Sequence, residues 1–231
     1  MIGLEKEGLV YKLIMDAGEN RWNTTFVREF SAALDQVDQD DGPGALVTCA
    51  TDPKFFSNGL DLDWVRSPET HPEGGDRELF GKEFMHLMGR IITLPIPSIC
   101  AINGHGFGAG FMMALCHDVR IMREDRGFLC ANEMQLGLTI PRPELALFHH
   151  KLPADTFFET VQLSKRWTGR MALDAGIVQE TVAVDELPLA AERKAEELAP
   201  LANNRVNFRA QKEALYGCLL YTSPSPRDLS T

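Results

Sequence analysis

Hydrophobic residues recur along the chain with two spacings, which predict alternating helices and strands. Residues 24–39 carry apolar side chains three or four positions apart, the spacing of an amphipathic helix with Thr24 or Thr25 as its N-cap. Residues 45–50, ALVTCA, are apolar throughout, which is typical of a strand buried on both faces of a parallel sheet. Together these stretches predict an α/β fold.

The same patterns extend to the rest of the chain. Strands are expected at residues 8–16, 99–102, 117–122, 127–131 and 177–182. Helices are expected at residues 77–94, 148–163, 170–175, 187–201 and 207–216. Residues 66–76 form a polar loop, and Pro141 and Pro143 are expected to interrupt regular structure. Units of the ββα type recur loosely along the chain.

The chain divides into three regions by character. Residues 1–200 carry the core pattern, and residues 201–216 begin a C-terminal helical region that is expected to be shortened. Residues 217–231, GCLLYTSPSPRDLST, have no helical period and contain Ser/Pro repeats. We expect this tail to be non-native or disordered, and it is left out of the fold prediction.

Composition indicates an ordinary globular protein and argues against several classes of partner. Of 231 residues, 44% are hydrophobic and 24% charged, and the net charge is −10, which disfavours nucleic acid or an anionic membrane as partner. Five cysteines without paired spacing indicate a reducing compartment, and the six histidines show no metal-ligand spacing, so no metal site is expected. The chain has no 18-residue apolar stretch, so no membrane span is expected.

Two turns that follow predicted strands are candidates for binding an oxyanion through backbone amides. The stretch Ser98–Leu115 runs from a strand through glycines 104, 106, 108 and 110 into an apolar helix. Glycine lets a ligand approach the main chain closely, and a helix start presents free amides. Ser57-Asn58-Gly59 forms a similar turn after the strand at 45–50. Two amides that converge on one carbonyl oxygen would form an oxyanion hole.

Glu133 is the best acid/base candidate, because it is a lone carboxylate between apolar neighbours. Burial there would raise its pKa towards a useful range, although an ordinary exposed turn glutamate remains an alternative. A dinucleotide site formed by Gly104, Gly106 and Ala109 with Glu124 is disfavoured by the short helix that follows. Ser57 lacks the G-x-S-x-G pattern of a serine hydrolase.

Three blocks of this sequence resemble the crotonase (enoyl-CoA hydratase/isomerase) superfamily. They are FFSNGLDL (55–62), LPIPSICAINGHGFGAGFMMALCHDVRIM (94–122) and ANEMQLGL (131–138), and the resemblance runs from about Leu4 to Leu215. It implies a crotonase-like α/β spiral of repeated ββα units with C-terminal helices, assembled as a homo-trimer or hexamer. It also implies acyl-CoA thioester substrates, with coenzyme A as part of the substrate and no separate cofactor.

The resemblance assigns roles to individual residues. The amides of Leu60 and Ala109 would form the oxyanion hole, and Glu133 aligns with one of the two glutamates of the hydratases. Contacts to coenzyme A would come from residues within 54–61 and from the glycine loop: Lys54, Phe56, Ser57, Asn58, Gly59, Asp61, Gly108 and Gly110.

The second glutamate of the hydratases falls on Met112, which cannot transfer a proton. One carboxylate suffices to move a proton from C2 to C4, so the resemblance favours a Δ3,Δ2-enoyl-CoA isomerase of unsaturated fatty-acid β-oxidation. NEMQLGL resembles that branch too, and the peroxisomal type in particular, with cytoplasm or mitochondrion as other locations. Alternatives are a hydratase or another thioester-enolate enzyme using Asp61, Asp63 or Asp118, and a non-catalytic acyl-CoA-binding homologue.

Overall fold

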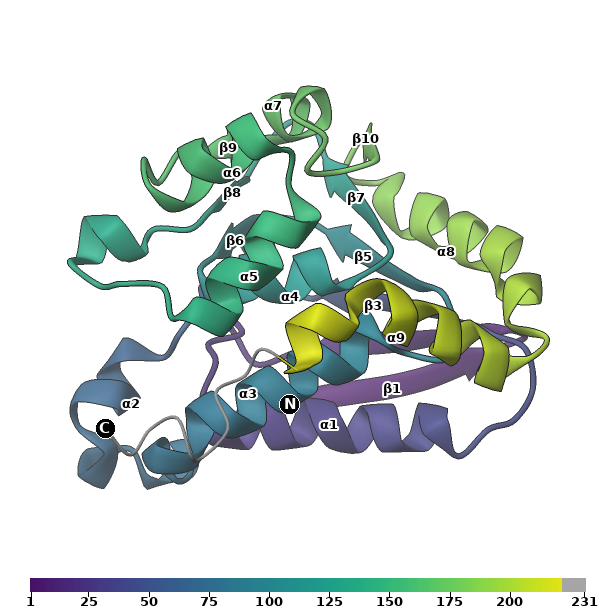
Figure 1. Ribbon diagram of the computed structural model, residues 1–231, viewed down its shortest axis with the longest axis horizontal. Coiled ribbons are helices and arrows are strands. Elements are labelled where there is room, and N and C mark those ends of the chain that lie inside the picture. The colour runs from purple at the N-terminus through teal and green to yellow at the C-terminus, as the bar shows by residue number, and fades with distance from the viewer. Residues whose placement is uncertain (222–231) are drawn as a thin grey trace.

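A six-stranded sheet forms the centre of the computed structural model, which describes residues 1–221, with side chains as far as Tyr216 (Figure 1). Its strand order is β1-β2-β3-β5-β7-β10. The strands are β1 (Ile2–Glu7), β2 (Val10–Met15), β3 (Ala45–Ala50), β5 (Ser98–Ile102), β7 (Val119–Arg123) and β10 (Glu180–Val182). β1 runs antiparallel to β2, whereas every other neighbouring pair is parallel. The α/β prediction is therefore confirmed.

A second sheet of four short strands stands beside the first, in the order β4-β6-β8-β9. Its strands are β4 (Phe55–Ser57), β6 (His105–Phe107), β8 (Phe128–Cys130) and β9 (Trp167–Thr168). In three consecutive units a strand of the large sheet leads into a short strand and then into helical structure, which is the predicted ββα repeat. The units end in α2 (Leu62–Arg66) with α3 (Arg77–Ile92), in α4 (Ala109–Cys116), and in a 3-10 turn (Glu133–Leu136) before α5 (Arg142–Lys151).

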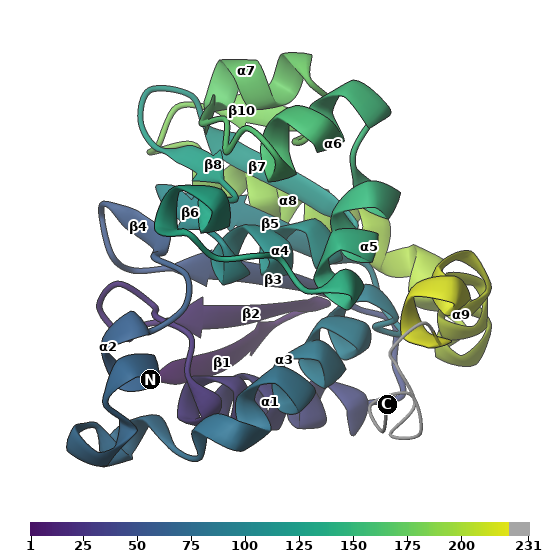
Figure 2. The same cartoon turned by 60° about the vertical axis from the view of Figure 1, so that its left-hand side comes forward.

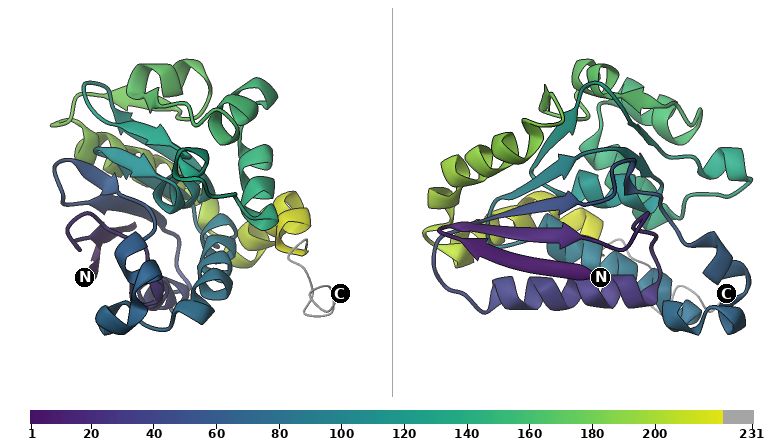
Figure 3. Two further views of the ribbon diagram at one scale, coloured as in Figure 1. Left: turned by 90° about the vertical axis from the view of Figure 1, so that its left-hand side faces the viewer. Right: turned by 180° about the vertical axis from the view of Figure 1, so that it is seen from behind.

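Helices cover both faces of the large sheet (Figures 2 and 3). α1 (Thr24–Asp38), α3 and α4 contribute to the main core, and α8 (Leu187–Leu198) packs against the opposite face. β3 shows the consequence, because Leu46 belongs to the main core while Val47 packs with α8. The expected burial of this strand on both faces is confirmed.

Several element boundaries differ from the prediction for local reasons. The N-cap of α1 is Asn23 rather than a threonine, and its Oδ1 accepts the N–H of Phe26 at 2.9 Å. The helix expected over 148–163 is two helices, α5 and α6 (Ala154–Val161), separated at Leu152–Pro153. Pro143 lies within the first turn of α5, where an amide has no intrahelical acceptor, so proline is tolerated there. The sequence did not predict strands at β1, β4, β6 or β9.

The C-terminal part contains α7 (Gly169–Asp174), α8, a 3-10 turn (Ala199–Ala202) and α9 (Arg205–Tyr221). α9 extends past Tyr216, where the sequence pattern placed the end of the helical region. The remainder of the predicted tail, residues 222–231, lies outside the described residues. Among residues 1–221, no helix combines the length and hydropathy needed to cross a bilayer. In the same part of the chain, no group of three or more His, Cys, Asp or Glu side chains is placed to hold a metal ion.

Candidate active site

A cavity of about 180 Å³ brings together the three residues predicted to carry the chemistry. It lies where all three ββα units pass from their short strands into helical structure. Its lining includes Leu60, Ala109 and Glu133, and also Asn58, Gly59 and Gly108 from the set predicted to bind coenzyme A. The remaining lining residues are Arg21, Leu62, Asn132, Leu136 and Leu138.

The Leu60 amide is directed by a short parallel bridge to Trp22. The Trp22 N–H donates to the Gly59 carbonyl at 2.8 Å, and the Asp61 N–H donates to the Trp22 carbonyl at 2.9 Å. The Gly59 carbonyl and the Asp61 N–H therefore face Trp22. The N–H of a trans peptide points opposite to its carbonyl, so the Leu60 N–H points away from Trp22. That amide is a donor on the cavity side of the turn.

The Ala109 amide is the first of helix α4. The amides of a first helical turn have no intrahelical acceptor, and the helix dipole adds partial positive charge at that end. The preceding residue is fixed in place, because the Gly108 N–H donates to the Cys130 carbonyl and the Gly108 carbonyl accepts the Met112 N–H, each at 3.0 Å. The structure thus offers two backbone donors from separate units to one cavity.

Glu133 begins the 3-10 turn that follows β8, and its carboxylate is half-buried. Burial raises its pKa above the usual value of a glutamate. Its Oε2 is enclosed and has no hydrogen-bond partner among the described residues. The other oxygen, Oε1, lies against Gly108, where a Cβ atom would come within 2.9 Å of it. A lone carboxylate with raised proton affinity therefore faces the cavity.

Met112 lies one turn after Ala109 on α4, and its side chain is buried in the main core. Every residue of α4 is buried, which agrees with its apolar sequence. A thioether has no proton to transfer, so Met112 serves packing.

Phe56 and Ser57 were predicted to contact coenzyme A, but both are fully enclosed, which leaves their side chains no surface to offer a ligand. The Ser57 Oγ accepts the Trp22 Nε1–H at 3.0 Å and donates to the Asn20 carbonyl at 2.7 Å. This hydroxyl holds the β4 turn against the loop after β2. The same bonds exclude Ser57 as a nucleophile.

The other predicted coenzyme A contacts, Lys54, Asp61 and Gly110, do not line this cavity. Lys54 places its Nζ 4.7 Å from the centre of the Phe55 ring. Asp61 caps α2 by accepting the Trp64 N–H at 3.3 Å. Gly110 packs directly on Ser57, so a Cβ atom there would come within 2.5 Å of the Ser57 Cβ. For these three residues a role in binding stays a prediction.

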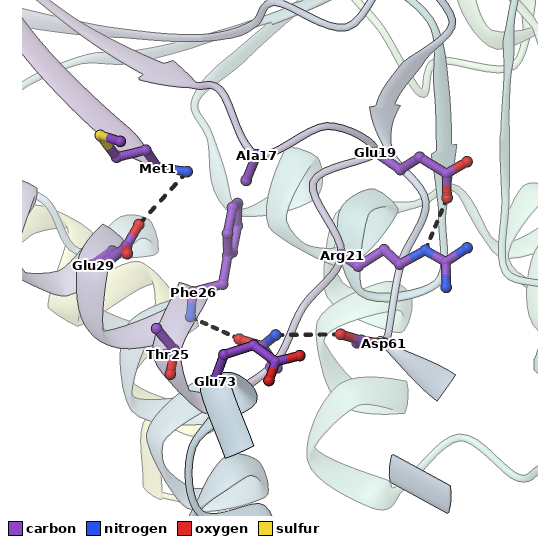
Figure 4. A pocket seen from close by; sticks show the side chains of 10 residues that line it. Met1, Ala17, Glu19, Arg21, Thr25, Phe26, Glu29, Asp61 and Glu73 are labelled. Carbon is purple, nitrogen blue, oxygen red and sulfur yellow. Dashed lines mark hydrogen bonds and ion pairs between the residues drawn. The ribbon is translucent and has the colours of Figure 1, made fainter. Parts of the chain in front are cut away.

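A second, more open cavity of about 410 Å³ lies beside the first (Figure 4). Arg21 lines both cavities. Its guanidinium is paired with Glu19 at 2.8 Å and with Asp63 at 3.0 Å. Asp61 also lines the larger cavity, where its carboxylate accepts a hydrogen bond from Asn23.

None of the three aspartates considered as a second acid lines the smaller cavity. Asp61 and Asp63 are engaged as described above. Asp118 accepts hydrogen bonds from the Ser98 amide and hydroxyl and from the Lys212 ammonium. The alternative of a dinucleotide site is also disfavoured. That motif needs a strand that leads through the glycine turn directly into a helix, whereas β6 lies between β5 and α4.

Sequence reasoning missed Arg21, Leu62, Asn132, Leu136 and Leu138 as lining residues. Asn132, Leu136 and Leu138 belong to the ANEMQLGL block, so that block was the signal that could have found them. Arg21 lies in the loop after β2 and has no local signal. The bridge between Trp22 and Leu60, together with the hydrogen bond from the Asn58 N–H to the Glu19 carbonyl, brings it to the site.

Comparisons with known proteins show which family this chain is similar to. The family described as enoyl-CoA hydratase/isomerase matches residues 5–217. Peroxisomal enoyl-CoA delta isomerase 2 of Arabidopsis thaliana is 30% identical over 221 residues, with 94% of this chain and 92% of that protein covered. Carnitinyl-CoA dehydratase of Salmonella typhi is 33% identical over 152 residues, with 64% and 56% covered.

Solved structures are similar over nearly the whole chain. A probable enoyl-CoA hydratase of Mycobacterium tuberculosis has a TM-score of 0.84 at 27% identity, with 95% of this chain and 89% of that chain covered. A second structure of the same protein, described as an apo enoyl-CoA isomerase, has a TM-score of 0.83 at 25% identity, with 95% and 92% covered. This one neighbour is therefore described both as a probable hydratase and as an isomerase.

Proposed function

This chain belongs to the enoyl-CoA hydratase/isomerase family, and we propose that it acts as a Δ3,Δ2-enoyl-CoA isomerase. The substrate would be a 3-enoyl thioester of coenzyme A, and the product the conjugated 2-enoyl thioester. No separate cofactor is required, because coenzyme A is part of the substrate.

One observation carries the proposal. Among the described residues that line the small cavity, Glu133 is the single carboxylate, and it shares the cavity with the amides of Leu60 and Ala109. Hydration of a double bond needs a water molecule held for attack and usually a second acid. Transfer of one proton between two carbons of the same substrate needs a single base beside an oxyanion hole.

The proposed reaction has two proton transfers. The Leu60 and Ala109 amides donate to the thioester oxygen, which makes the C2 proton more acidic. The Glu133 carboxylate takes that proton, and the electrons of the C2–H bond delocalise into a dienolate over the oxygen and C2 to C4. Protonated Glu133 then returns the proton to C4, which leaves the double bond between C2 and C3. The raised pKa of Glu133 suits both steps, because the group must accept and donate.

A hydratase is the second candidate, favoured by similarity to a carnitinyl-CoA dehydratase. The mycobacterial neighbour does not discriminate, because it is described both as a probable hydratase and as an isomerase. The three isomerase relatives of Arabidopsis thaliana each match at least 77% of this chain, against 64% for the dehydratase. Coverage therefore favours the isomerase.

Location and assembly are further parts of the proposal. Two of the similar Arabidopsis proteins are described as peroxisomal, which supports a peroxisomal location. A trimer or hexamer stays a prediction from the family resemblance, to be checked by light scattering of the purified protein.

The test compares a 3-enoyl-CoA and a 2-enoyl-CoA in separate reactions, followed by absorbance of the conjugated product and by mass. We expect conversion of the first without a mass change and no hydration of the second. Glu133→Gln should lower kcat by about 10²–10⁴-fold while coenzyme A ester binding is retained. Glu159→Gln, on the partly exposed face of α6 and outside both cavities, is the control and should keep full activity. Hydration of the 2-enoyl ester, or full activity of Glu133→Gln, would overturn the proposal.

A further inference from the structure

The loop after β2, residues 16–23, lies against the turn that carries the Leu60 amide, and Glu19 of this loop bonds to the turn twice. The Glu19 carbonyl accepts the Asn58 N–H at 2.8 Å, and the Glu19 Oε2 accepts the Asn58 Nδ2–H at 2.8 Å. Glu19 lines the larger cavity, whereas Asn58 lines the smaller one. The Glu19 carboxylate therefore supports the wall of the proposed active site from outside, through the Asn58 side chain.

The bond between these two side chains is of the stronger, charge-assisted kind. The hydrogen bond from Asn58 lowers the pKa of Glu19, partial burial opposes this effect, and the Arg21 guanidinium adds to the lowering. Glu19 is therefore ionised at neutral pH. A carboxylate can only accept hydrogen bonds, so the NH₂ group of Asn58 must face it. Bonds of this kind are shorter and stronger than bonds between neutral groups.

Arg21 extends this contact to the other side of Leu60. Its Nε donates to the same Glu19 oxygen at 2.8 Å (Figure 4), and its Nη1 donates to the Asp63 Oδ2 at 3.0 Å. Asn58 precedes Leu60 by two residues and Asp63 follows it by three, so side-chain bonds brace both sides of the turn. The Asp63 side chain is 63% exposed, and an ion pair so open to water contributes little. The bond from Asn58 to Glu19 is therefore the part of the brace that we expect to matter most.

The turn needs this support because Gly59 has little stiffness of its own. Its φ is +78°, and glycine has the least restricted backbone of any residue. Its carbonyl, which shares a peptide group with the Leu60 N–H, accepts the Trp22 N–H at 2.8 Å. Trp22 lies three residues after Glu19, in the same loop. A shift of this loop against the turn would therefore rotate the Leu60 N–H within the cavity.

We propose that Glu19 is a positioning residue of the oxyanion hole, which holds the turn through Asn58 and so keeps the Leu60 N–H aimed at the thioester oxygen. In this role Glu19 does not touch the substrate. The inference rests on the proposed isomerase function, in which that oxygen becomes negative in the dienolate. A displaced donor stabilises the developing charge less well, so the chemical step is slowed more than substrate binding is weakened.

The first test separates kcat from KM. Glu19→Ala removes the carboxylate but keeps the main-chain bond from the Asn58 N–H, and we expect kcat for a 3-enoyl-CoA to fall about three- to tenfold with KM changed by less than about twofold. Glu19→Gln keeps an oxygen that can accept the Asn58 Nδ2–H and should recover most of this loss. A native kcat in Glu19→Ala would refute the proposal.

Glu159→Ala is the matched control. Glu159 is paired with Lys165 at 2.7 Å, as Glu19 is paired with Arg21 at 2.8 Å, and the two glutamate side chains are 41% and 38% exposed. Glu159 lines neither cavity. Loss of its ion pair should therefore leave kcat unchanged. An equal fall of kcat in Glu159→Ala and Glu19→Ala would refute a specific role of Glu19.

The route through Asn58 is tested by combining variants. Asn58→Ala should lower kcat about as much as Glu19→Ala, and the double variant should lose no more than either single variant, because all three break the same bond. Losses that multiply in the double variant would refute this route. If Glu19→Ala does not fold, as judged by circular dichroism, Asn58→Ala alone carries the test, and a native kcat there would refute the proposal.

A spectroscopic measurement separates this proposal from the isomerase function. The probe is bound 2,4-hexadienoyl-CoA labelled with ¹³C at the thioester carbonyl, whose infrared band falls in frequency when the oxygen accepts hydrogen bonds. The band should lie below that of the free ester in the native protein and in Glu159→Ala, and should move back towards it in Glu19→Ala. An identical band in the native protein and Glu19→Ala would refute the positioning role and leave the isomerase function standing. The expected shift without isomerisation of a 3-enoyl-CoA would refute the isomerase and support the role of Glu19.

Discussion

Gly108 gives the sharpest test of the active-site geometry, because it combines an unusual backbone conformation with direct contact to Glu133. Its φ is +43°, a region that residues with a Cβ atom rarely adopt. An alanine Cβ would lie 2.9 Å from the Glu133 Oε1, whereas ordinary contacts begin near 3.4 Å. The Gly108→Ala substitution therefore acts both on the backbone and on the base.

The two effects have different sizes. Holding a non-glycine residue at this φ costs about 1–3 kcal/mol of folding stability. Relief of the contact requires the carboxylate to move by about half an ångström, because the backbone amides around it are held by hydrogen bonds. Since a misplacement of about 1 Å can cost on the order of 100-fold in rate, we expect kcat to fall about 10- to 100-fold.

Gly8→Ala is the matched control. Gly8 lies between β1 and β2 with φ of +56°, and a Cβ atom there would meet no heavy atom within 4 Å. Both variants should lose a similar free energy of unfolding in urea, but only Gly108→Ala should lose isomerase activity. If the two variants kept equal kcat values, the role proposed for the Glu133 carboxylate beside Gly108 would be refuted.

Two further predictions concern stability. Met112→Ala should lower the free energy of unfolding in urea by about 2–5 kcal/mol, because it opens a cavity in the core. It should retain turnover in the 3-enoyl-CoA assay. Loss of turnover with folding intact would give Met112 a part in the chemistry. Burial lowers the pKa of His117 to about 4, whereas an unfolded histidine titrates near 6.5. The unfolded chain therefore binds the extra proton between these values, so unfolding free energy should fall by up to roughly 3 kcal/mol as pH drops from about 6.5 to 4. This dependence should flatten in His117→Gln, and an unchanged slope would refute it.

Local patterns predicted the longer elements, in which a stripe or run of apolar side chains packs into the core along the whole element. The stripe of Phe30, Leu34 and Val37 in α1 and the apolar run of β3 are buried as expected. Predictions failed where a few backbone bonds decide the structure. β6 has three residues and exists because it pairs with β4 and β8, and no periodicity can be read in so short a segment.

The proposed site shows the same division. The glycine run, the Asn58-Gly59 turn and the lone Glu133 were recognisable as candidate chemistry from the sequence, because each has an unusual local composition. That the side chains of Phe56 and Ser57 are enclosed could not be predicted, since a short motif does not show which of its side chains turn inward. Arg21 had no local signal at all.

The sequence by itself determined the α/β class, the repeated ββα units and the backbone donors, because periodicity and glycine placement act over a few neighbouring residues. Only the tertiary structure decided that Leu60, Ala109 and Glu133 share one cavity and that Asp61, Asp63 and Asp118 do not line it. These relations depend on strand pairing and on the bridge between Trp22 and Leu60. Such contacts join residues far apart in the chain, and their energies depend on burial and charge that no single segment encodes.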